Sequence, residues 1–103
     1  MANKNSIKKR KIHRDCWDLE YTFIQWLNEH CKVYLKDTSK FINLTFHKFT
    51  YEGVEYTQEE VIKMMISLSD NLLKIDDDWS IQYYKDRDKL LDLWKLVIGA
   101  MWW

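Results

Sequence analysis

Histidine and cysteine are the side chains in this sequence best suited to binding a metal ion. His13 and Cys16 form a His-x-x-Cys pair, and His30 is followed directly by Cys31. Four ligands of these types would suit a structural zinc ion. Adjacent residues on a helix point about 100° apart, so one ion could hardly bind both His30 and Cys31. The pattern therefore does not predict a metal centre, and no cofactor is expected.

The other chemical patterns also fall short of a catalytic site. The run Asp76-Asp77-Asp78 lacks the alternating ligands, central glycine and distal glutamate of a calcium loop, so a solvated turn before a helix is expected. The chain has no glycine-rich phosphate loop and no nucleophile elbow, and its histidines form no recognisable hydrolytic arrangement. We therefore do not expect an enzyme.

Aromatic residues are the most prominent feature of the composition, with six tryptophans and six tyrosines among 103 residues. Many of these should be core residues, but aromatic rings beside a cation also suit stacking on a base or packing in a protein interface. Arg87 falls within the apolar face of an expected helix and needs a carboxylate or a ring, and Glu20 is its predicted partner. The candidate ligand-binding or partner-binding residues are Glu20, Trp26, His30, Tyr83, Arg87, Trp102 and Trp103.

The segment 17–36 predicts a helix that is apolar around most of its circumference. One stripe has ordinary core spacing and comprises Trp17, Tyr21, Ile24, Leu27, Cys31, Tyr34 and Leu35. A second stripe comprises Leu19, Phe23, Trp26 and Val33. A helix of this kind is usually buried on two sides. We expect a homo-oligomer through the helix 17–36, unless the hairpin and the terminal tryptophans cover the second stripe.

Three polar residues, Glu20, Asn28 and His30, interrupt the apolar arc of this helix. An unpaired polar group in apolar surroundings costs free energy, so each of them needs a partner. Either they lie at the edges of the arc and reach water or a backbone group, or they line a polar pocket within an aromatic wall. The sequence leaves both interpretations open.

The remaining pattern predicts an α+β fold that is mostly helical, with three main helices and a small β-hairpin between the first two. Asp15 is a plausible N-cap for the first helix, and Glu52-Gly53 is the expected hairpin turn. The segment 57–60 has the T-x-x-E form of a capping box and should open a second helix that reaches residue 75. The third helix is expected from about residue 80 to residue 100.

Length and charge indicate one domain with a distinct N-terminal segment. Residues 1–14 hold six basic residues and no acid, so residues 15–103 carry sixteen acids against ten bases. We expect a flexible basic arm at 1–14, either solubilising or in contact with phosphate or an acidic partner, and a single compact helical domain at 15–103. The acidic body argues against nucleic-acid binding except through residues 4–14. No signal peptide or membrane span is expected, and a cytoplasmic location follows.

Three stretches carry a family resemblance: WDLEYTFIQWLNEH with KVYLKD, then FHKFTYEGVEYTQEE, and LWKLVIGAMWW. Over residues 16–103 the chain resembles a family of small phage and prophage proteins of Gram-positive bacteria. The resemblance implies an accessory phage protein that acts by binding in the cytoplasm of the infected or lysogenic host. It supplies no catalytic or ligand residues, and Cys31 stands where an aliphatic residue is expected.

Two classes of binding function follow from the resemblance together with the aromatic residues. In the first, the protein sequesters a cyclic nucleotide immune signal, with Trp26, Tyr83 or Trp103 stacking on a base and Arg87 or lysines meeting the phosphates. In the second, it inhibits a host defence effector such as a CRISPR nuclease by protein contact. A further alternative is a structural or regulatory phage protein that acts by oligomerising. An open Arg87 in an aromatic cavity would favour sequestration, whereas a pair with Glu20 would weaken it. An acidic patch of Asp70 and residues 76–78 would favour the inhibitor.

Overall fold

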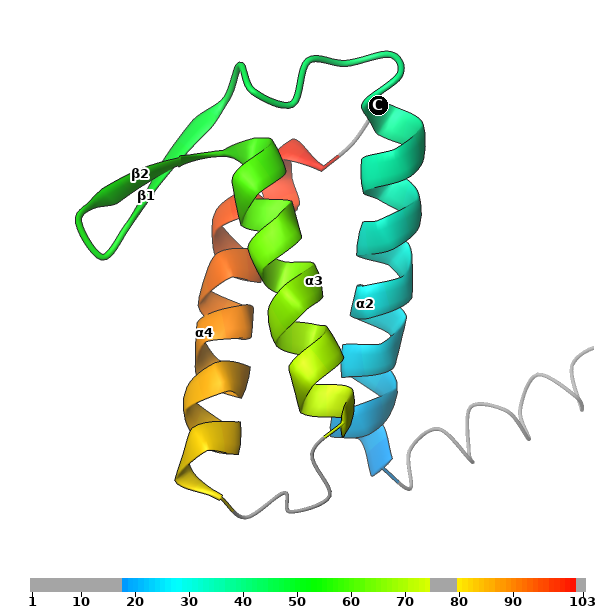
Figure 1. Ribbon diagram of the computed structural model, residues 1–103, viewed down its shortest axis with the longest axis vertical. Helices are drawn as coiled ribbons and strands as arrows, with labels where there is room; N and C mark the ends of the chain where they lie inside the picture. Colours follow the sequence, from blue (N-terminus) through cyan, green and yellow to red (C-terminus); the bar gives the residue numbers. More distant parts are fainter. Residues whose placement is uncertain (1–17, 75–79, 102–103) are drawn as a thin grey trace, which may run out of the picture.

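The protein folds as three helices with a two-stranded antiparallel hairpin between the first two, as the sequence predicts (Figure 1). The computed structural model describes residues 18–74 and 80–101. Helices α2 and α4 run in the same direction, and α3 runs antiparallel to both and packs against each of them. The elements are α2 (Leu19–Thr38), β1 (Lys48–Tyr51), β2 (Val54–Thr57), α3 (Gln58–Lys74), α4 (Ile81–Val97) and the 3₁₀ helix η2 (Ile98–Ala100).

Short polar side chains set where the helices begin. Asp18 caps α2, since its Oδ1 accepts a hydrogen bond from the Tyr21 backbone N–H at 3.1 Å. The helix thus begins two residues later than the expected Trp17, and the expected cap, Asp15, lies outside the described residues. The Ser80 hydroxyl caps α4 in the same way as Asp18 caps α2.

The predicted capping box at the start of α3 is confirmed. The Glu60 backbone N–H donates to the Thr57 hydroxyl at 3.2 Å, and the Thr57 backbone N–H donates to Glu60 Oε1 at 3.0 Å. Hydrogen bonding to Thr57, first of all to its backbone N–H, lowers the pKa of the Glu60 carboxyl. Two donors that would otherwise lack partners are satisfied, and the chain passes from strand to helix without a loop.

The hairpin turns at Glu52-Gly53, as predicted, and both residues have positive φ, 51° and 77°. Two residues of this conformation form the tight turn that matches the twist of an antiparallel pair. The strands pack mainly against α3 and α4. The hairpin therefore does not cover the second apolar stripe of α2, because it approaches the bundle from the other side.

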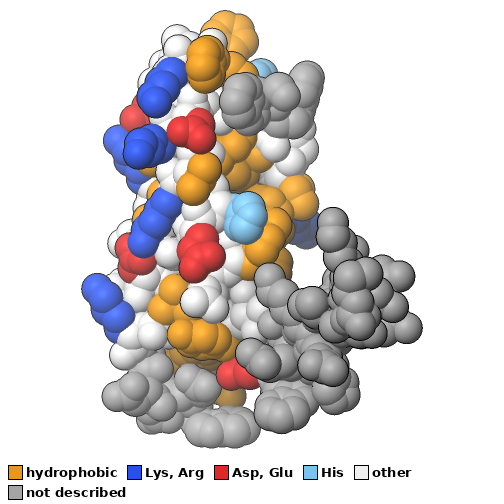
Figure 2. Space-filling view, turned by 90° about the vertical axis from the view of Figure 1, so that its right-hand side faces the viewer, with side chains coloured by type: hydrophobic (Ala, Val, Ile, Leu, Met, Phe, Trp, Pro, Cys, Tyr) orange, Lys and Arg blue, Asp and Glu red, His pale blue; other side chains and the backbone are white. Residues whose placement is uncertain are grey.

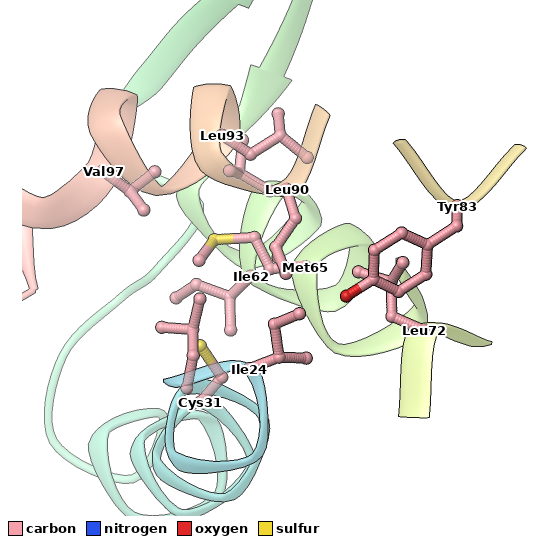
Figure 3. Close-up of a cluster of buried hydrophobic side chains, with 11 residues drawn as sticks. Ile24, Cys31, Ile62, Met65, Leu72, Tyr83, Leu90, Leu93 and Val97 are labelled. Atoms are coloured by element: carbon pink, nitrogen blue, oxygen red, sulfur yellow. The ribbon is translucent and has the colours of Figure 1, made fainter. Parts of the chain in front are cut away.

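The core lies along the line where all three helices meet, and Figure 3 shows side chains from each helix pointing into it. Tyr21 was expected there but is exposed, because it lies about 120° around the helix from the fully buried Leu27. Ile62 and Leu93 are buried although the sequence pattern did not select them. The buried cluster comprises Ile24, Leu27, Cys31, Val61, Ile62, Met65, Leu72, Tyr83, Leu90, Leu93 and Val97.

A polar network joins α2 to α3 beside this core. The buried Asn28 amide donates to the Ser69 hydroxyl at 2.8 Å and to Asp70 Oδ1 at 2.9 Å, and Lys32 Nζ binds the same oxygen at 2.9 Å. The Lys32 hydrogen bond, aided by Asn28, holds the pKa of Asp70 below its usual value despite the opposing effect of burial. The hydrogen-bond partners of Asn28 thus come from α3.

Candidate functional site

A hollow opens between the C-terminal halves of α2 and α4, on the side away from the hairpin. Its volume is about 290 Å³. Six residues of α2 form one wall, and Trp94 of α4 faces Trp26 with the ring centroids 6.5 Å apart and the rings nearly perpendicular. The lining residues are Trp26, His30, Val33, Tyr34, Asp37, Thr38, Trp94 and Met101.

The Trp26 ring is held in place by its neighbours on α2. It stacks on the His30 ring with centroids 4.3 Å apart and lies 6.2 Å from the Phe23 ring. His30 Nδ1 lies 2.7 Å from the Trp26 carbonyl oxygen, which can only accept, so Nδ1 carries the hydrogen. The hollow therefore has a fixed aromatic wall, and little side-chain freedom is lost when something binds to it.

An apolar stripe continues from the hollow along α2. Leu19, Trp26 and Val33 are seven residues apart, and 62%, 45% and 59% of their respective surfaces are exposed. Figure 2 looks at this side of the molecule and shows hydrophobic side chains along it, with the charged side chains gathered mainly at one edge. On α4, Leu91 and Ile98 are also exposed and, like Trp94, project from the side of the helix that turns toward α2. We call this surface, Leu19, Trp26 and Val33 with Trp94, Leu91 and Ile98, the aromatic groove.

Glu20, Tyr83 and Arg87 form a separate cluster that joins α2 to α4 near the start of both helices. The predicted pair is confirmed: Arg87 Nη1 donates to Glu20 Oε1 at 2.9 Å, and the Tyr83 hydroxyl donates to Glu20 Oε2 at 2.9 Å. Arg87 also binds Asp88 and lies over the Tyr84 ring at 4.9 Å. These carboxylates raise the pKa of Arg87 further above its ordinary value. The guanidinium is committed to partners within the protein.

The sequence-selected residues thus divide into two groups, since Trp26 and His30 line the hollow whereas Glu20, Tyr83 and Arg87 lie in the cluster. Tyr83 is buried and has no open face for a base. Trp102 and Trp103 lie outside the described residues.

Sequence reasoning missed Trp94 as a site residue because it shares helical spacing with core residues. The signal that could have identified it is the 87–94–101 spacing, which places Trp94 and Met101 on the same side of α4 as Arg87.

The electrostatics of the hollow do not suit a phosphate. Asp37 is the charged residue of its lining, and no lysine or arginine is found there among the described residues. No group of three or more His, Cys, Asp or Glu side chains within residues 18–74 and 80–101 could hold a metal ion. The hollow is suited to apolar and aromatic groups.

A second hollow, of about 380 Å³, lies between the hairpin turn and α4. Charges of both signs from α4 line it, and the Tyr51 hydroxyl lies 3.5 Å from Asp92 Oδ2. It is lined by Tyr51, Glu52, Lys85, Asp86, Asp88, Lys89 and Asp92. This is an open, mixed-charge surface of the kind that water covers well.

No protein-family model, curated protein or solved structure matches the chain. Among the described residues, no helix has the length and apolar character needed to cross a membrane.

Proposed function

We propose that the protein is a non-catalytic binding protein whose aromatic groove takes the apolar face of a helix from a protein partner. The observation that carries the proposal is the exposed stripe of Leu19, Trp26 and Val33 on a helix already buried on its other side. Contiguous exposed apolar surface rimmed by polar residues marks interaction sites, and tryptophan is enriched among the residues that dominate binding energy.

The shape of the groove favours a helical ligand. Helices α2 and α4 run parallel to each other on either side of α3, and both present apolar side chains at seven-residue spacing. A helix laid antiparallel between them would complete a four-helix arrangement, in which each helix has antiparallel neighbours. Amphipathic helices bind such grooves through residues that recur every three or four positions.

Among the functions expected from the sequence, this geometry supports protein contact better than nucleotide sequestration. A nucleotide signal needs a free cation near an open ring, whereas Arg87 binds Glu20 and Asp88, and the hollow contributes Asp37. A host defence effector remains the partner class that the phage resemblance implies. Of the acidic patch expected for such an inhibitor, Asp70 binds Lys32 and Asn28, and residues 76–78 lie outside the described residues. A second copy of the chain would use the same face of α2, so self-association would compete with such a partner.

The test is affinity capture from a Gram-positive bacterial lysate with three forms of the protein. The wild type and an Ile81→Glu control should retain the same protein, and a Trp26→Glu/Val33→Glu variant should lose it. Ile81 is a matched control because it is an exposed aliphatic residue on α4 that lies outside the groove. Equal capture by all three forms would reject the proposal. Native mass spectrometry showing a nucleotide-sized adduct that survives purification would also reject it, in favour of sequestration.

A further inference from the structure

We propose that the aromatic groove accepts helix α2 of a second copy of this chain in antiparallel orientation, with the two-fold axis beside Trp26. The inference rests on the proposed function, since it names an occupant for the same surface.

The apolar stripe is symmetric about Trp26. Leu19 lies seven residues before Trp26 and Val33 seven residues after it, while Phe23 and His30 fall between them at alternating steps of four and three. This alternation is the spacing of a seam between two paired helices. In an antiparallel pair centred on Trp26, the two Trp26 rings meet at the axis and Leu19 packs against the partner's Val33.

The charges along α2 favour the antiparallel orientation. Asp18 caps the start of the helix and Lys36 lies in its last turn. They are eighteen positions apart, which is five full turns at 3.6 residues per turn, so both side chains lie on the same edge. Their midpoint is residue 27, within one residue of the apolar centre at Trp26. An antiparallel pair places Asp18 beside the partner's Lys36 twice, whereas a parallel pair opposes like charges and aligns the helix dipoles unfavourably.

The direction of α4 agrees with this arrangement. Because α4 runs parallel to α2, an antiparallel α2 from the partner is antiparallel to both walls of the groove. Exposed Leu91 and Ile98 on α4 then border the incoming helix. Self-association consequently covers the surface assigned to other partners, so dimer formation and partner binding compete and the protein concentration sets the balance.

Single cysteine variants test the register. Leu19→Cys and Val33→Cys chains, each in a Cys16→Ser background, are oxidised separately and as an equal mixture. The remaining native thiol, Cys31, is buried, and burial raises its pKa to about 11, so it reacts slowly. We expect a disulfide dimer in the mixture, linking position 19 to position 33, and little dimer from either variant alone. Efficient 19–19 and 33–33 disulfides would overturn the antiparallel register.

Light scattering after size-exclusion chromatography tests the association itself. The wild type and Ile81→Glu should have the mass of a dimer, and Trp26→Glu should raise the dissociation constant roughly tenfold or more, with unchanged circular dichroism. A wild type that stays monomeric at its highest soluble concentration would reject the dimer. If that monomer still loses its captured protein on Trp26→Glu/Val33→Glu substitution, only the dimer fails. If a dimer of this register forms while capture is indifferent to the substitutions, only the proposed function fails.

Discussion

The two sides of α2 carry equally apolar residues but differ in how far the fold buries them. Toward α3, Leu27 and Cys31 are fully buried and Asn28 has three hydrogen-bond acceptors close to it. Toward the aromatic groove, Trp26 and Val33 remain about half exposed. The helix therefore carries more apolar surface than its own fold uses. The type of an apolar residue alone does not show whether it belongs to the core or to an interface. How fully neighbouring side chains cover it does.

The largest expected effect on stability comes from the side of α2 that packs against α3. Leu27→Ala should destabilise the fold by about 2–5 kcal/mol, because the removed methyl groups leave a cavity at the meeting point of the three helices. Urea denaturation followed by circular dichroism would measure the loss. A cost below about 1 kcal/mol would mean that this side is not the core.

Cys31, on the side of α2 that packs against α3, should make the stability of the fold depend on pH, and this effect is of intermediate size. Burial raises the pKa of its thiol from 9.0 to about 11, so the unfolded chain loses this proton at lower pH than the folded chain. The stabilising contribution is full below pH 9 and is lost as the pH rises toward 11, by roughly 2–3 kcal/mol in total. Denaturation midpoints between pH 8 and 11, compared with a Cys31→Val control, isolate this effect. The same slope in both proteins would place the thiol in contact with water.

The smallest expected effect on stability comes from the side of α2 that faces the aromatic groove. Val33→Ala should change stability by less than about 0.5 kcal/mol, because more than half of this side chain is already in water. The same urea denaturation applies, with Leu27→Ala as the reference on the same helix. A loss comparable to that of Leu27→Ala would abolish the difference between the two sides and make the groove part of the core.

Local signals in the sequence were sufficient for the elements of the fold. The Thr57–Glu60 capping box and the Glu52-Gly53 turn depend on a few neighbouring residues, and both occur as predicted. The pair of Glu20 and Arg87, 67 residues apart, was also predictable, because a guanidinium on an apolar face needs a carboxylate.

The site was less predictable, because helical spacing does not show how much of a helix's circumference its neighbours cover. Trp94 and Leu91 share one periodic face with the buried Leu90, yet they lie at its margin, where α2 and α4 separate. The sequence predicts Asn28 at the edge of the apolar arc or in a pocket, whereas its partners come from α3. The sequence of α2 does not show which face of α3 turns toward it. Only the packed arrangement separates the core from the margin.

Gln58, the first residue of α3, has a mechanical consequence. Its buried side-chain amide donates to the Ala100 carbonyl at 3.2 Å and lies 3.4 Å from the Tyr34 hydroxyl, so it fastens the last turns of α2 to η2, which follows α4. The opposite end is fastened at a partly exposed position, where Glu20 accepts hydrogen bonds from Arg87 and Tyr83 and water screens the ion pair. If the groove widens to admit a helix, we expect the walls to hinge about Gln58 and to part first at Leu19.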